Sequence, residues 1–131
     1  MILKMAGGFR ELAHGKKTGP SLTECISDYP QENERQIIQY LKSGIIFMAC
    51  MGVFKDVLDD TRNFWIAPHL LTDGSWLWYN DLSYYVETYH ARVPPKFVRA
   101  MKLNQWKVPP ENSIDLNELE SRYDSQSIEF Y

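Results

Sequence analysis

The stretch Leu71–His90, LTDGSWLWYNDLSYYVETYH, holds six of the eighteen aromatic residues in a chain of 131 residues. Within it, Asp73 and Gly74 predict a tight turn, because aspartate bonds to its local backbone and glycine accepts a positive φ. The next residues alternate as a strand does, which places Trp76 and Trp78 on one face. The stretch therefore predicts a hairpin whose rings build the core.

A helix is expected directly after this strand. Asn80 or Asp81 is suited to cap it. The apolar positions that follow are spaced at i, i+3, i+4 and i+7, as on one face of a helix, and are Leu82, Tyr85, Val86 and Tyr89. These side chains should therefore face the core. Tyr79 and Tyr84 lie off the apolar stripes, so we expect them to reach the surface, where tyrosine often takes part in recognition.

Further helices are predicted on both sides of this stretch. Ser21 and Glu24 have the spacing of a capping box. A second helix is expected over residues 30–43, with Gly44 as its left-handed stop, and others over residues 94–104 and 115–124. The basic residues Lys96, Arg99 and Lys102 recur three apart, so they should share one outer helical face.

Strands are predicted around the hairpin. Residues 45–50 read as a buried strand, residues 64–67 as a strand ended by Pro68, and residues 127–131 as an edge strand. Residues 1–19 are rich in glycine and are expected to be loosely structured apart from one short strand or helical turn. The pattern predicts a single α+β domain over residues 1–131, in which a small antiparallel sheet, with its hairpin near residues 64–79, packs against several short helices.

Composition limits the function classes. A hydrophobic fraction of 44% and a charged fraction of 24% are typical of soluble globular domains. No segment has the apolar length of a signal peptide or a membrane span, and Cys25 and Cys50 are too few for a disulfide scaffold, so we expect a cytosolic protein. The formal net charge of -3 argues against direct binding of nucleic acid across the whole surface.

Charges are unevenly distributed along the chain. Residues 91–107 carry basic side chains and no acid, whereas residues 111–131 carry six acids against Arg122 alone. Such segregation is typical of solvated faces that pair with one another. It also leaves the basic residues apart from the aromatic hairpin, which disfavours a binding groove for single-stranded nucleic acid.

No motif identifies a catalytic, cofactor or metal site. His14, His69 and His90 stand in no zinc-binding spacing, and the chain has no nucleophile elbow and no phosphate-binding glycine loop. We therefore expect a protein that is not an enzyme and that uses no cofactor. A pocket that joined His69 or His90 to Asp73 or Glu87 would favour an enzyme instead.

A family resemblance covers residues 20–108. The segments SLTECISDYP, IIQYLKSGIIFMAC and DVLDD, followed by LTDGSWLWYNDLSYYVETYHARVPPKFVRAMKLNQW, resemble a group of small bacterial proteins. In that group a TDG-x-W-x-W strand runs into a DL-x-YYV-x-x-Y helix and a Pro-x-x-Phe helix. These proteins are associated with immunity against polymorphic and contact-dependent growth-inhibition toxins. The group has proline after the second tryptophan, where this chain has Tyr79.

The resemblance implies a non-enzymatic immunity protein that binds one cognate toxin domain in the cytosol. Many such toxins are basic nucleases, so an acidic inhibitor would be attracted to them. Two acidic surfaces are candidates, and Tyr79 and Tyr84 are candidate aromatic contacts. One surface comprises Asp56, Asp59 and Asp60, and the other comprises Glu118, Glu120 and Asp124. The alternatives are an interaction or structural module of another bacterial system and an enzyme with an unrecognised site.

Overall fold

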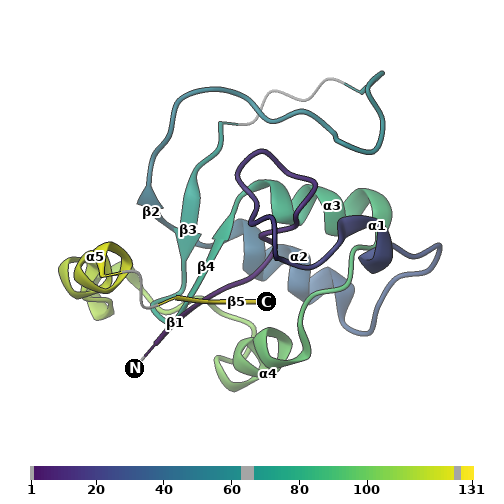
Figure 1. Ribbon diagram of the computed structural model, residues 1–131. Coiled ribbons are helices and arrows are strands. Elements are labelled where there is room, and N and C mark those ends of the chain that lie inside the picture. The colour runs from purple at the N-terminus through teal and green to yellow at the C-terminus, as the bar shows by residue number, and fades with distance from the viewer. Residues whose placement is uncertain (1, 63–66, 126–127) are drawn as a thin grey trace.

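A five-stranded mixed sheet organises the chain in this computed structural model, which describes residues 2–62, 67–125 and 128–131 (Figure 1). The strand order is β2-β3-β4-β1-β5. The strands are β1 (Leu3–Met5), β2 (Ile45–Met48), β3 (Leu70–Thr72), β4 (Trp76–Tyr79) and β5 (Ile128–Phe130). The α-helices are α1 (Leu22–Cys25), α2 (Glu34–Lys42), α3 (Asp81–Tyr89), α4 (Pro95–Leu103) and α5 (Leu116–Asp124), and a 3-10 turn, η1, covers Glu111–Ser113. The predicted α+β class is confirmed.

The sheet is antiparallel only in part. β2, β3 and β4 form the expected antiparallel meander, with Leu71 opposite Trp78 in the hairpin. β1 runs parallel to both β4 and β5, which makes the sheet mixed rather than antiparallel. Residues 64–66 of the strand predicted over residues 64–67 lie outside the described residues.

The N-terminal segment was expected to be loosely structured apart from one short strand or helical turn. β1 is the short strand that was anticipated, but it lies inside the sheet, between β4 and β5. Leu3, Met5 and Phe9 are buried. A three-residue strand carries too little periodicity to reveal that its partners lie more than 70 and 120 residues away.

The turn between β3 and β4 forms as predicted. Gly74 has a φ of 101°, and Asp73 Oδ1 accepts hydrogen bonds from the backbone N–H groups of Ser75 and Trp76 at 2.9 and 2.7 Å. The other oxygen of Asp73 accepts a bond from the Tyr40 hydroxyl of α2 at 2.7 Å. Asn104, just after α4, donates to that hydroxyl at 2.9 Å. The turn is thereby fixed to two helices.

The two faces of the sheet carry separate cores. Trp76 and Trp78 face α2, α3 and α4, and the Trp76 ring stacks on Phe97 of α4 at 4.6 Å. Leu77 points the other way, into a smaller core with Leu119 of α5. The alternation predicted for β4 is confirmed, and it places α4 and α5 on opposite faces of the sheet (Figure 1).

β2 departs from its expected burial. Residues 45–50 were predicted to form a buried strand, but β2 ends at Met48 and occupies an edge of the sheet. Ile46 and Met48 are exposed. An uninterrupted apolar run is typical of a fully buried strand as well as of an edge strand. Composition alone therefore did not reveal that β2 lies at the edge of the sheet.

Gly44 is required for close packing rather than for a left-handed stop. A Cβ at this position would lie 2.5 Å from Cζ2 of Trp78 and 2.8 Å from Cβ of Leu71. The absence of a side chain lets the chain between α2 and β2 pass directly over the tryptophan.

The cap of α1 also differs from the prediction. Ser21 makes no capping bond of its own. Glu11 accepts hydrogen bonds from the backbone N–H groups of Leu22 and Thr23 at 2.8 and 3.1 Å and from the Ser21 hydroxyl at 2.8 Å. Desolvation opposes ionisation here, yet these bonds lower the pKa of Glu11 from 4.5 to about 2.

Substituting Gly44→Ala should destabilise the fold by about 1–3 kcal/mol, because the added methyl group overpacks a rigid core. Gly8→Ala is the matched control, since its Cβ would meet only Phe130 Cδ1 at 3.7 Å. Its free energy of unfolding should stay within about 1 kcal/mol of the parent. Urea denaturation measures both, and equal stabilities of the two variants would contradict the close approach at Gly44.

Substituting Glu11→Gln should lower the free energy of unfolding by about 1 kcal/mol at pH 7. The folded pKa of Glu11 lies below its unfolded value, so the ionised carboxylate stabilises the fold above pH 4.5. That advantage is lost as the pH falls through about 2, where parent and variant should converge. Thermal unfolding across this range tests it. Glu24→Gln, an exposed control, should show no such pH-dependent gap.

Candidate functional site

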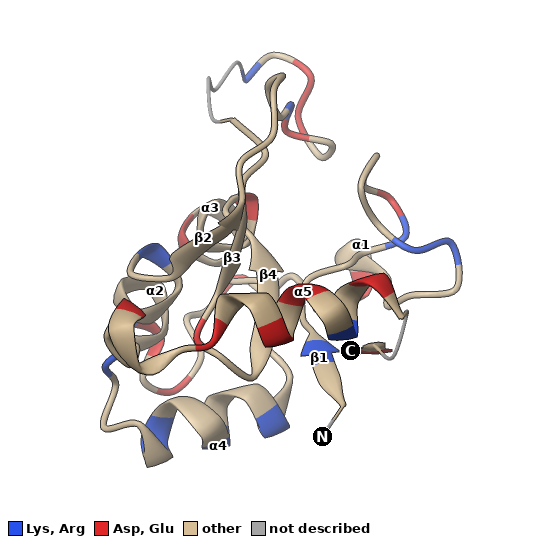
Figure 2. Cartoon of the chain, turned by 90° about the vertical axis from the view of Figure 1, so that its left-hand side faces the viewer, with Lys and Arg blue, Asp and Glu red and all other residues tan. Residues whose placement is uncertain are grey.

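The acidic C-terminal helix presents the first of the candidate surfaces. Asp115 precedes α5, and its side chain caps the helix by accepting a bond from the Glu118 N–H at 3.0 Å. Glu118 pairs with Arg122. Glu120 and Asp124 are exposed, and within the described part of the chain neither has an ion-pair partner. We call Glu118, Glu120 and Asp124 the α5 surface (Figure 2).

Asp56 does not belong to an acidic surface, although the sequence suggested that it would. Its exposed fraction is 3%. Its carboxylate accepts hydrogen bonds from the hydroxyls of Tyr84 and Tyr89, each at 2.6 Å, and from the backbone N–H of Leu58 at 2.8 Å. Burial and then the bond to Asp56 raise the pKa of Tyr89. Asp56 therefore fixes the loop between β2 and β3 onto α3.

The other two acids of this loop remain accessible to different degrees. Asp59 accepts bonds from the hydroxyl and the backbone N–H of Thr61, at 2.5 and 3.0 Å, and pairs with Arg62 at 3.2 Å. These bonds, led by the Thr61 hydroxyl, lower the pKa of Asp59. Asp60 is exposed. The loop thus offers a smaller and more internally satisfied negative surface than α5 does.

The two candidate tyrosines are half-buried. Tyr84 is held by Asp56, so its hydroxyl already takes part in fixing the loop. Tyr79 lies with its ring 4.0 Å from the His14 ring and 6.3 Å from the Phe54 ring. Only Tyr79 also faces an open hollow of the surface.

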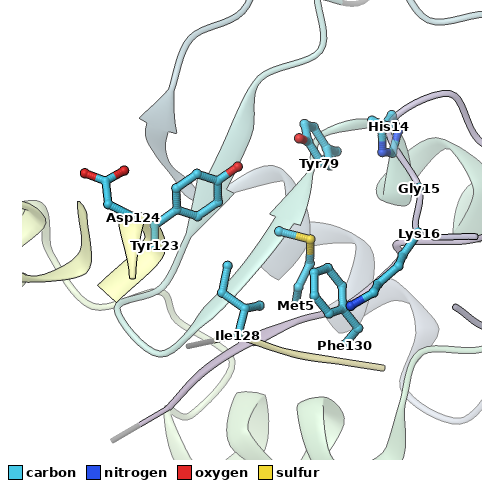
Figure 3. A pocket seen from close by; sticks show the side chains of 9 residues that line it. All are labelled: Met5, His14, Gly15, Lys16, Tyr79, Tyr123, Asp124, Ile128 and Phe130. Carbon is cyan, nitrogen blue, oxygen red and sulfur yellow. The ribbon is translucent and has the colours of Figure 1, made fainter. Parts of the chain in front are cut away.

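That hollow is a pocket of about 570 Å³, shown in Figure 3. Tyr123 and Asp124 of α5 lie on one side of it, and His14 lies on the other. Tyr79 stands between them, while Met5, Ile128 and Phe130 contribute apolar walls. Two predicted contact residues, Tyr79 and Asp124, are therefore brought to one pocket, and Asp124 is the member of the α5 surface that lines it.

A buried histidine–aspartate pair lies beside the pocket, and sequence reasoning missed it. His14 Nε2 is 2.7 Å from Asp81 Oδ2, and Asp81 is 1% exposed. Burial raises the pKa of Asp81, and the bond with His14 opposes that rise. Such a pair can exchange a proton, yet the described residues that line the pocket include no serine, threonine or cysteine that it could activate. The two residues are 67 positions apart, so no local pattern links them.

The residues that would have favoured an enzyme have other partners in the described part of the chain. His69 Nδ1 accepts a bond from the Cys50 N–H at 3.2 Å, and His90 Nδ1 lies 2.8 Å from Glu34 Oε2. Asp73 is occupied by its turn and by Tyr40. Among the described residues no group of three or more histidine, cysteine, aspartate or glutamate side chains could hold a metal ion.

Comparisons with protein-family models, curated proteins and solved structures gave no match. The family resemblance of the sequence motifs therefore stays a prediction. In the described segments, no helix has both the length and the apolarity that crossing a lipid bilayer demands.

Substituting Asp56→Ala should destabilise the protein by about 2 kcal/mol, because it removes the acceptor of two tyrosine hydroxyls and two loop N–H groups at once. Asp60→Ala, the same change at an exposed position of the same loop, should shift stability by less than about 0.5 kcal/mol. Urea denaturation gives both values. Comparable losses in the two variants would show that Asp56 does not fix the loop.

Proposed function

We propose that this protein is a non-enzymatic immunity protein that binds and neutralises a cognate toxin domain of the nuclease type in the bacterial cytosol. The observation that carries the proposal is the α5 surface, where Glu120 and Asp124 project into solvent without an ion-pair partner in the described chain. Unpaired carboxylates grouped on one rigid helix are suited to meet a basic partner.

Electrostatics gives this surface an inhibitory mechanism. A nuclease binds the phosphates of its substrate through lysine and arginine side chains. The carboxylates of the α5 surface would pair with those same side chains and occupy the substrate-binding surface. The net charge of -3 adds a long-range attraction that raises the association rate.

The pocket beside α5 adds a specific contact to this attraction. Tyr79 and Tyr123 line it, and Asp124 stands at its rim. Aromatic walls fit the aliphatic stem of a lysine or arginine side chain, and Asp124 would meet its charged head on the side of the pocket opposite Lys16. One basic side chain of the toxin would anchor there, while a neighbouring one pairs with Glu120.

The test is co-expression with the toxin domain encoded immediately upstream of this protein's gene. Cells that produce the toxin should survive only when this protein is present, and the two purified proteins should form a tight one-to-one complex. Calorimetry at increasing ionic strength should show the affinity falling, because salt screens the charges of the α5 surface. Loss of viability despite co-expression would refute the proposal.

Charge reversal identifies the surface that is used. Glu120→Lys combined with Asp124→Lys should lower the association rate with the toxin by about tenfold at low salt. Asp28→Lys combined with Glu32→Lys is the matched control, since both residues are exposed, lie outside α5 and give the same change in net charge. Stopped-flow association separates the two, and equal slowing would assign the effect to net charge alone.

A further inference from the structure

β2 leaves one side of its backbone open. In the described part of the chain it pairs with β3 on one side and stands at the end of the strand order. Native proteins usually protect such an edge with lysine, proline or an inward-pointing charge. Ile45–Met48 contains none of these, although its outward N–H and C=O groups could pair with another strand.

Exposed apolar side chains are frequent on β2 and in the loop that follows it. Ten large hydrophobic residues are exposed in the described structure, and half of them fall between positions 46 and 57. Ile46 and Met48 lie on the strand itself, and Ile46 is 52% exposed. Met51, Val53 and Val57 lie in the loop. The strand edge thus carries exposed apolar side chains of the kind that interaction surfaces use.

The acidic helix borders the same edge. Phe47 of β2 and Tyr123 of α5 pack with their ring centroids 5.7 Å apart. Figure 1 shows α5 beside the end of the sheet that β2 occupies. α5 therefore packs against the face of β2 that carries Phe47, next to the edge of the sheet.

We propose that the β2 edge, Ile45–Met48, binds an extended segment of the cognate toxin domain, which adds to the sheet as a sixth strand. Backbone hydrogen bonds would supply affinity, and apolar side chains of the segment would cover Ile46 and Met48. Lysine or arginine next to the segment would meet the α5 surface. This inference rests on the proposed function, whose partner it assigns to one element.

A second copy of this chain suits the edge less well. Antiparallel pairing of two β2 strands places a two-fold axis perpendicular to the sheet. Both α5 helices would then lie on the same face of the joined sheet, and their carboxylates would repel across the junction. A basic partner turns that repulsion into attraction, so charge favours the toxin over self-association.

The first test is an edge variant. Ile46→Lys should weaken binding of the upstream-encoded toxin domain by about 10- to 100-fold, because a buried ammonium opposes strand addition. Leu103→Lys is the matched control, since Leu103 is 80% exposed on α4, away from this edge. It should bind as the parent does. Circular dichroism and thermal unfolding confirm that both variants fold.

The second measurement separates strand addition from side-chain contact. Amide hydrogen exchange followed by NMR should show that alternate N–H groups of β2, open in the free protein, exchange at least about tenfold more slowly in the complex. The amides of α4 should keep their exchange rates.

Failure of this inference is distinguishable from failure of the proposed function. If the parent protects cells and binds the toxin, but Ile46→Lys binds equally well and β2 gains no protection, strand addition is wrong and immunity stands. If the parent neither protects nor binds, both fall. Protection of β2 that appears in the protein alone and grows with its concentration would identify a second copy as the occupant and overturn the toxin assignment.

Discussion

The Asp73 carboxylate is the constraint on which the arrangement of the helices depends. One oxygen shapes the β3–β4 turn, and the other accepts the Tyr40 hydroxyl, which Asn104 reaches from the end of α4. A buried carboxylate must be satisfied by several donors, so the turn, α2 and α4 have to meet at one point. Trp76 and Trp78 fill the space enclosed by that meeting. The aromatic hairpin is therefore scaffold, and the surfaces that we propose for a partner lie on α5 and along β2.

Sequence predicts those parts of the fold whose signals are local. The hairpin, α3 and α4 follow from spacing of two, three and four residues, and Leu82, Val86 and Phe97 are buried as their positions require. β1 and the Glu11 cap could not be found in this way, since each depends on a partner fixed only by the tertiary structure. The apolar run of β2 showed that it is a strand and not that it lies at an edge.

From the sequence, the candidate site could be predicted only as a set of charged residues, without their exposure or their partners. Sequence singles out the acids of α5, but it treats Asp56 and Asp60 alike, although one is buried beneath two tyrosine hydroxyls and the other faces solvent. Which carboxylates are free depends on donors brought from distant elements. The pocket shared by Tyr79 and Asp124 joins residues 45 positions apart, and proximity of that kind leaves no trace in composition or periodicity.

The sheet separates the charges of its two flanking helices. Lys96, Arg99 and Lys102 lie exposed on α4, whereas the carboxylates lie on α5 across the sheet, and no ion pair among the described residues joins the two (Figure 2). α4 and α5 therefore present opposite charges on opposite faces of the sheet. At 0.1 M salt such charges act over about 10 Å of solution, so a basic partner of the kind proposed would be attracted to one face before contact.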